Sequence, residues 1–287
     1  MSDTDTLLLG AVAYDPKVVT IWEGFKAYFS RRGLDFDYVL FSNYERQVES
    51  HLAGEFHVAW NSPLAWVRTR RLAQSRGVKV EAVAMRDTDR DLTSVVVVKN
   101  DSGVGSVEDL RGKRVAVGAV DSPQATLIPL SHLRAQGLVP GEDFEVVYND
   151  LLGGKHGDHI GGEREAARSL LAGGCEAACM IDGNHLLFIS EGTLPPGATR
   201  VLTQTDAYDH CNFTVSADAP PELVSRFREL LLGMSYEDAE VRPLLDLEGL
   251  KVWHEGRLQG YAALERAVDE AGFYDADGNI TIDGYRY

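Results

Sequence analysis

Histidines and acidic residues gather in one glycine-rich stretch of the sequence, "GGKHGDHIGGEREAARSL", at residues 153–170. Neutral imidazoles and carboxylates are the usual ligands of Fe(II), Zn(II) and Mn(II), and two histidines with one carboxylate leave coordination positions open for a substrate. His156, His159 and Glu163 have the residue types for such a divalent metal site. No standard zinc motif such as H-E-x-x-H is present, so a solvated loop and an anion-binding loop remain alternatives.

A second polar group follows a predicted strand in "MIDGNH", where Asp182 and His185 come directly after apolar residues. In a doubly wound sheet the carboxyl ends of the strands face one crevice, so we expect these side chains on the same side as the glycine-rich loop. Asp182 is therefore a further candidate metal ligand. Tyr14, at the end of the first predicted strand, and His185 are the candidate proton donors or acceptors of a catalytic site.

Three predicted strands run into a proline that follows a potential helix cap, in "AYDPK", "WNSPL" and "VDSPQ". Asp15, Ser62 and Ser122 have side-chain oxygens suited to the N-cap position, and proline is pre-organised for the first helical position. Helix N-termini present free backbone N–H groups and a partial positive charge, so several of them at strand ends predict a pocket for a small anion. The candidate substrate-binding residues are Asn61, Ser62, Ser122, Gln124 and Thr126.

These sites require a framework that brings strand ends together. Short Val-rich apolar runs alternate with longer amphipathic segments, which is typical of an α/β protein with mainly parallel sheets. The predicted strands are 7–14, 36–41, 58–60, 80–85, 94–99, 114–118, 144–148, 177–181, 200–204 and 212–216. The predicted helices include 18–32, 44–53, 64–74, 124–136, 163–172, 222–232 and 261–270.

Charge and composition exclude several classes of partner. The chain has 28 basic and 44 acidic residues, a net charge of −16, so its field repels nucleic acid and anionic membrane surfaces. No apolar stretch approaches the roughly 18 residues that a membrane span needs. The N-terminus "MSDTDTLLLGAVAYDPK" has acids where a secretory signal has Lys or Arg. We therefore expect a cytoplasmic protein, or a periplasmic or extracellular one if a leader has been removed, that binds a small anionic molecule, without nucleic acid and without membrane insertion.

The stretch "SVEDLRGKRVAVGAVDSPQATLIPLSHLRAQGL", residues 106–138, resembles the second-lobe opening of type II periplasmic substrate-binding proteins, in particular the phosphonate, phosphite and phosphate branch of ABC-transporter receptors. The segments "AWNSPLAWV", "REAARSLLAGGCEAACMID" and "GYAALERAVDEAGF" extend the resemblance over most of the chain. It implies two α/β lobes joined by two crossover strands, with the ligand held in the cleft. By this resemblance lobe 1 comprises residues 1–98 and 212–287, and lobe 2 comprises 99–211.

The same resemblance implies roles for single residues. Ser122 matches the serine at the start of the family's second-lobe binding helix, although the residues after it thin the hydroxyl cluster that family members place there. Asn61 and Ser62 lie in the first-lobe loop that faces the ligand in the family. Glu163 takes the place of a ligand-facing histidine, so the sequence departs from the family at its binding site.

Two functions from different classes fit these observations. The first is a cytoplasmic enzyme that binds a small carboxylate or phosphonate in the interlobe cleft and uses a divalent metal, as a lyase, decarboxylase or oxygenase. The substituted loop and the absence of a leader-like N-terminus favour this reading, and the superfamily includes cytoplasmic enzymes such as chorismate dehydratase. The alternative is a non-catalytic solute-binding protein of a phosphonate- or phosphate-type ABC transporter.

Overall fold

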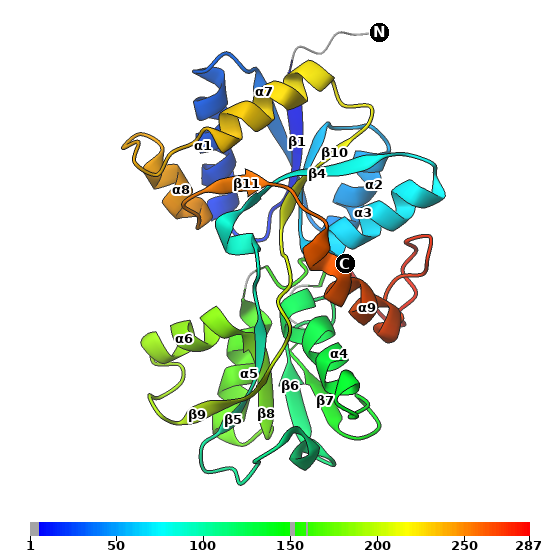
Figure 1. The fold of residues 1–287 in the computed structure, drawn as a ribbon, viewed down its shortest axis with the longest axis vertical. Coiled ribbons are helices and arrows are strands. Elements are labelled where there is room, and N and C mark those ends of the chain that lie inside the picture. The colour runs from blue at the N-terminus through cyan, green and yellow to red at the C-terminus, as the bar shows by residue number, and fades with distance from the viewer. Residues whose placement is uncertain (1–5, 150–152, 159) are drawn as a thin grey trace. The chain divides into compact units, whose positions relative to one another are not determined.

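The computed structural model describes residues 6–149, 153–158 and 160–287, and the chain divides into two compact units. Each unit has a central sheet with helices on both faces (Figure 1). Unit 1 comprises Met1–Arg90, Asp209–Tyr261 and Tyr274–Ile280. Unit 2 comprises Asp91–Tyr208, Ala262–Phe273 and Thr281–Tyr287.

Unit 1 is built on a six-stranded sheet in the order β11-β4-β10-β3-β1-β2. β1 pairs with β2 and β3 in parallel, so the carboxyl ends of these strands lie at one edge of the sheet. β10 runs antiparallel between β3 and β4. The strands are β1 (Leu7–Val12), β2 (Phe36–Phe41), β3 (Val58–Asn61), β4 (Val80–Arg86), β10 (Asn212–Ser216) and β11 (Trp253–Glu255).

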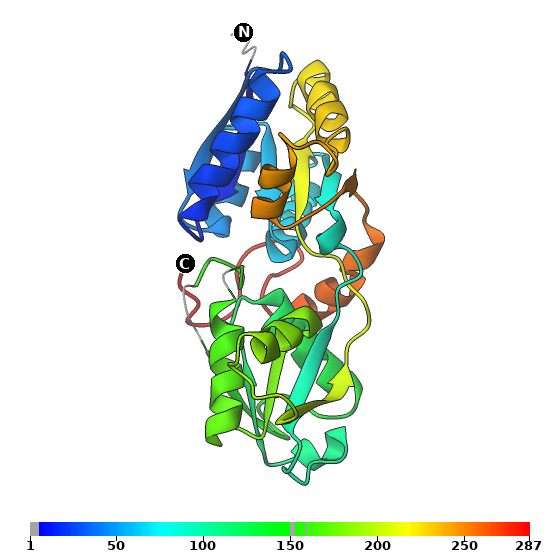
Figure 2. The same ribbon diagram turned by 90° about the vertical axis from the view of Figure 1, so that its left-hand side faces the viewer.

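Helices cover both faces of the sheet of unit 1. α1, α7 and α8 pack on one face around an aromatic cluster that includes Phe25, Phe213 and Phe227, and Figure 2 looks onto the side of α1. α2 and α3 cover the other face (Figure 1). These helices are α1 (Lys17–Ser30), α2 (Tyr44–Leu52), α3 (Pro63–Ser75), α7 (Pro221–Leu232) and α8 (Arg242–Glu248), with short 3₁₀ turns η1 (Asp87–Asp89) and η4 (Gln259–Tyr261).

Unit 2 is built on a five-stranded sheet in the order β7-β6-β8-β5-β9. β6 is parallel to β7 and β8, whereas β5 is antiparallel to β8 and β9. The carboxyl ends of β6 and β8 therefore lie at the same edge. The strands are β5 (Ser94–Lys99), β6 (Arg114–Val117), β7 (Glu145–Tyr148), β8 (Ala177–Ile181) and β9 (Thr199–Gln204).

The helices of unit 2 also form two layers. α5 and α6 pack on one face of the sheet around Leu170 and Phe188, and α4 packs on the other around Leu133. α9 lies against α4 through its buried stripe of apolar residues. The elements are η2 (Val107–Leu110), a π-helical turn η3 (Pro123–Leu127), α4 (Ile128–Ala135), α5 (Gly161–Ala172), α6 (Asp182–Ser190) and α9 (Ala262–Ala271).

The structure confirms the predicted α/β class and adds elements that the sequence pattern did not indicate. β11, α6 and α8 were not predicted. Gly183 and Asn184, near the start of α6, have low helix propensity, so the local sequence does not favour this helix. The buried Phe188 anchors α6 on the sheet. Both sheets are mixed because β5 and β10 run against their neighbours.

The division into units differs from the predicted lobes at the first boundary and at the C-terminus. Residues 91–98, which were predicted in lobe 1, belong to unit 2, because β5 pairs with β8 and β9 of that unit. α9 and residues 281–287 belong to unit 2, whereas the predicted lobe 1 contained all of 212–287. The physical reason is the apolar stripe of α9, which includes Leu264 and Val268 and is buried in unit 2. None of the helices in the described part of the chain is long and apolar enough to cross a membrane.

Candidate functional site

The two serine–proline junctions fold as the sequence predicts. Ser62 caps α3 by accepting a hydrogen bond from the Ala65 N–H at 3.1 Å, and Ser122 accepts one from the Ala125 N–H at 3.2 Å at the start of η3. Both serines are buried, and they follow the carboxyl ends of β3 and β6. Each unit therefore has a helix N-terminus at a strand end, where the helix dipole favours negative charge.

Asn61, which precedes the first of these serines, is committed to the interior of unit 1. Its Nδ2 donates to Thr214 Oγ1 at 2.9 Å, and its Oδ1 accepts from Gln47 Nε2 at 2.9 Å. The side chain is fully buried. These bonds join β3 to β10 and α2, so the structure gives Asn61 a packing role, and its contact with a ligand stays a prediction.

Asp121, which precedes the second serine, organises the glycine-rich loop. Its Oδ2 accepts hydrogen bonds from the Gly154 N–H at 2.6 Å, the His156 N–H at 3.3 Å and the Tyr285 hydroxyl at 3.0 Å. Gly154, His156 and Gly157 have positive φ angles of 80°, 52° and 75°. Backbone N–H groups turned toward one point in this way form an anion-binding nest. The anion in the nest is the chain's own buried carboxylate.

The loop also packs directly on the start of η3. Gln124 Nε2 donates to the Gly157 carbonyl at 3.0 Å, and a Cβ atom at Gly157 would lie 2.5 Å from Ser122 Oγ. Only glycine fits that position, because the space is closed and the φ angle is positive. Thr126 Oγ1 donates to the Ala119 carbonyl at 2.7 Å. Ser122, Gln124 and the loop therefore form one assembly within unit 2.

The predicted carboxylate ligands of a metal have protein partners. Glu163 on α5 is buried, and its Oε2 accepts from the Ile181 N–H at 3.0 Å and from Asn184 Nδ2 at 2.7 Å. Asp182 Oδ2 accepts from Thr93 Oγ1 at 2.7 Å. Both carboxylates thus connect elements around the carboxyl end of β8.

Among the residues that the structure describes, the predicted metal ligands do not form one cluster. His156 is buried beside Asp121, and His159 lies outside the described residues. Within the described ranges, a different group of three potential metal-ligating side chains, which lies in unit 1, has its ligand atoms within 4.8 Å of one another. A divalent metal at His156, His159, Glu163 and Asp182 remains a prediction.

The two predicted proton-transfer residues lie in different surroundings. His185 Nε2 is 3.0 Å from Thr199 Oγ1, and burial lowers the pKa of this imidazole. Tyr14 follows β1, is half-buried and packs against the aromatic cluster of unit 1. The helix start beside it differs from the prediction by one residue: Pro16, not Asp15, is at the N-cap of α1, which has no side-chain cap, although Asp15 Oδ1 accepts from the Lys17 N–H at 2.8 Å.

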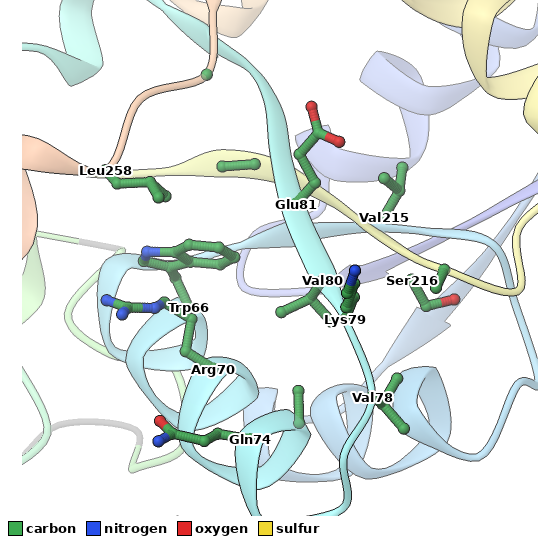
Figure 3. Close-up of a pocket in the computed structure, with 14 residues that line it drawn as sticks. Trp66, Arg70, Gln74, Val78, Lys79, Val80, Glu81, Val215, Ser216 and Leu258 are labelled. Carbon is green, nitrogen blue, oxygen red and sulfur yellow. The ribbon is translucent and has the colours of Figure 1, made fainter.

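The surface pockets within each unit overlap little with the predicted site. A pocket of about 790 Å³ in unit 1 runs beside α3 and the first residues of β4, and Figure 3 shows Trp66, Arg70 and Lys79 around it. None of the predicted site residues lines it. A pocket of about 210 Å³ in unit 2 is lined by Thr126 together with residues of α4 and α9.

Sequence reasoning missed Asp121 and Tyr285 as parts of this assembly. Asp121 stands in the quoted junction "VDSPQ", directly before the predicted cap. An acidic residue directly after a predicted strand, in a chain that also has a glycine-rich loop, could have indicated this contact. Tyr285 is 164 residues away from Asp121, and nothing local indicates their contact.

These features define a class of protein: two α/β units, each with a capped helix start at the carboxyl end of a parallel strand. A sequence model of the phosphonate periplasmic substrate-binding proteins of ABC transporters matches residues 11–264. The chain belongs to this family, as the resemblance of residues 106–138 had indicated.

Solved structures share the fold. PhnD1 of Prochlorococcus marinus in complex with methylphosphonate is 16% identical, with a TM-score of 0.70, covering 93% of this chain and 98% of that one. A Xanthomonas citri protein bound to chloride gives 16% identity and 0.70, with 93% and 99% covered. The aliphatic sulphonate binding protein SsuA of Escherichia coli gives 17% and 0.54, with 92% and 83% covered. The type II periplasmic-binding-protein fold predicted from the sequence is thereby confirmed.

The family assignment corrects two predictions. A metal-dependent lyase, decarboxylase or oxygenase was the preferred function, and it is wrong because the family consists of transporter substrate-binding proteins. The predicted cytoplasmic location is contradicted for the same reason, since members of the family are periplasmic. Both errors came from giving the loop histidines and the acidic N-terminus more weight than the order of the family's motifs.

Proposed function

We propose that this chain is a non-catalytic substrate-binding protein of an ABC transporter and that its ligand is a small oxyanion of the phosphonate class. The match of residues 11–264 to the phosphonate-binding family carries this proposal. The complex of the Prochlorococcus marinus relative with methylphosphonate supports the ligand class. In this proposal the protein partner is the transporter to which the ligand is delivered.

The start of η3 in unit 2 is the proposed anion-binding group. A serine hydroxyl can accept two hydrogen bonds and donate one. Ser122 Oγ accepts the cap bond from the Ala125 N–H, and in the proposed complex its hydrogen points to the oxyanion. η3 continues into α4, so the partial positive charge of the helix N-terminus acts at the same place.

Asp121 adds negative charge next to this helix start and thereby selects among oxyanions. Three hydrogen-bond donors stabilise its carboxylate, but the group remains buried and close in sequence to Ser122. Like charges in a buried site disfavour one another. A singly charged oxyanion is therefore the better ligand, and a sulfonate of the same size competes with a phosphonate.

Isothermal titration calorimetry with methylphosphonate, ethanesulfonate and inorganic phosphate tests the proposal. We expect saturable binding with one site per chain for methylphosphonate, and weaker binding for phosphate. Absence of binding for all three oxyanions at millimolar concentration would contradict the proposed ligand class.

A variant pair locates the binding group. Ser122→Ala removes the proposed donor and is expected to weaken methylphosphonate binding about tenfold to a hundredfold, because a hydrogen bond to a charged group contributes about 1.5–3 kcal/mol. Ser106→Ala is the matched control, since Ser106 also stands at a helix start in unit 2 but is exposed, before η2. Equal affinities of the two variants would remove Ser122 from the site.

A further inference from the structure

A histidine, a cysteine and an aspartate meet inside unit 1, away from the residues assigned above. Asp89 ends the 3₁₀ turn η1 after β4, and His210 and Cys211 directly precede β10. The two segments run side by side in Figure 1, and the His210 N–H donates to the Asp89 carbonyl at 2.8 Å. Two segments distant in sequence thus bring three potential metal ligands to one place.

Two of the three distances between the ligand atoms are close to those of a tetrahedral metal site. His210 Nδ1 lies 3.1 Å from Cys211 Sγ and 3.5 Å from Asp89 Oδ1, and all three atoms lie within 4.8 Å of one another. With metal–nitrogen and metal–oxygen bonds of about 2.0 Å and a metal–sulfur bond of about 2.3 Å, tetrahedral angles place such atoms about 3.3–3.5 Å apart. The observed distances approach these values before any ion is added.

Neighbouring groups hold the carboxylate in position. Arg86 donates from Nε to Asp89 Oδ2 at 2.6 Å and from Nη2 to Oδ1 at 2.8 Å, and the Cys211 N–H donates to Oδ1 at 3.1 Å. Ligating carboxylates in metal sites are commonly oriented by such hydrogen bonds.

The carboxylates around this cluster are buried and ion-paired. Arg86 pairs with Asp89 and, through Nη1 at 3.1 Å, with Glu248, so one guanidinium faces two carboxylates. Asp89, Glu248 and Cys211 are 1%, 6% and 2% exposed, so solvent screens these charges poorly. A divalent cation bound at Asp89 is attracted by this poorly screened carboxylate charge.

We propose that Asp89 Oδ1, His210 Nδ1 and Cys211 Sγ form a binding site for a divalent transition metal of the Zn(II) type. The mixed oxygen, nitrogen and sulfur donor set and the tetrahedral spacing are those that zinc prefers. Binding deprotonates the Cys211 thiol, and the proton is released to solvent. The ion joins the segment after β4 to the segment before β10.

Cobalt titration of the full chain, stripped of metal with a chelator, tests this site. We expect one equivalent of Co(II) to bind with an intense near-ultraviolet thiolate-to-cobalt band and the visible bands of tetrahedral cobalt, and Zn(II) to displace it. Cys211→Ser is expected to lose the thiolate band. Cys175→Ser is the matched control, because Cys175 is equally buried but lies in unit 2.

A thiolate band that persists in the Cys211→Ser variant, or no stoichiometric band in the wild-type chain, would overturn the metal site. All four tryptophans lie in unit 1, so thermal unfolding followed by tryptophan fluorescence shows whether each variant retains the fold of this unit. Methylphosphonate titration in the presence of chelator is independent of the metal, so failure of the metal site and failure of the proposed ligand class are distinguishable.

Discussion

The junctions at Ser62 and Ser122 share a strand end, a serine cap and a proline, yet the residue before each serine acts differently. In unit 1 the neutral Asn61 bonds to Thr214 and Gln47, which belong to the sheet and to α2. In unit 2 the charged Asp121 bonds to backbone N–H groups of a loop and to a C-terminal tyrosine.

At both junctions the serine cap contacts only the next few residues. The residue before the serine determines which distant segments of the unit bond to the junction. Asn61 ties its junction to the permanent core of the unit. Asp121 ties its junction to a glycine-rich loop through the N–H groups of Gly154 and His156. The proposed ligand site lies at the second junction.

The largest effect is expected when Asp121 is replaced by alanine. The Gly154 and His156 N–H groups and the Tyr285 hydroxyl lose their acceptor, at an expected cost of about 3 kcal/mol in the stability of unit 2. Hydrogen exchange is expected to rise in residues 153–158 and 281–287. Asp121→Asn keeps one acceptor oxygen and should show a smaller rise.

Asp101→Ala provides the control for this prediction, because Asp101 is an exposed aspartate of the same unit. Unchanged hydrogen exchange in residues 153–158 and 281–287 of the Asp121→Ala variant would show that Asp121 does not hold the loop. The two junctions would then not differ in the way described.

Acid should weaken the support of the first junction. α2 carries both Gln47 and, one turn later, His51, whose burial lowers the pKa from 6.5 to about 4. The unfolded chain binds a proton at His51 below pH 6.5 and the folded chain does not until about pH 4, so stability is lost as pH falls through this window, by at most about 3 kcal/mol.

Urea unfolding followed by tryptophan fluorescence at pH 7.5 and pH 4.5 measures this effect in unit 1. His51→Gln is expected to remove most of the pH dependence while it keeps a side-chain amide near the His57 carbonyl. If the wild type and the variant lose the same stability between the two pH values, His51 is not the responsible group.

Asn61→Ala is expected to destabilise unit 1 by about 2 kcal/mol, because it leaves buried hydrogen-bonding groups of Gln47 and Thr214 without their partner. The same fluorescence-detected unfolding measures it. A matched Asn184→Ala variant, which acts in unit 2, should leave this unfolding curve in place. An unaltered midpoint in Asn61→Ala would mean that the amide does not support the core.

The smallest stability effects are expected for the caps themselves. Ser62→Ala and Ser122→Ala should each cost about 1 kcal/mol, but only Ser122→Ala should also weaken methylphosphonate binding through loss of a direct contact. Thermal unfolding and calorimetry on both variants check this. If Ser62→Ala lost more methylphosphonate affinity than Ser122→Ala, the principal contact with the anion would lie in unit 1 instead of unit 2.

Local signals in the sequence were sufficient for much of this fold. Strands 36–41, 94–99, 177–181 and 212–216 were predicted with the bounds observed, because each is a short segment rich in apolar residues between turn or helix-start residues. The caps at Ser62 and Ser122 were predicted for the same reason, since a cap involves only the next few residues.

The surroundings of the candidate site could not be predicted, because they depend on contacts between distant segments. Asp121 meets Gly154 across 33 residues and Tyr285 across 164, and Asn61 meets Thr214 across 153. The order of the family's motifs indicated the fold correctly, whereas the loop histidines suggested enzymatic metal chemistry that the family assignment contradicts.

Hydrogen exchange with and without saturating methylphosphonate tests whether the ligand binds at the start of η3. If the ligand binds at the start of η3, protection should increase in residues 119–127 and in residues 153–158, which pack on that start. The Ser122→Ala variant should lose this protection at the same ligand concentration, and Ser106→Ala should keep it. An unchanged hydrogen-exchange rate throughout unit 2 at saturating methylphosphonate would contradict binding of the ligand at the start of η3.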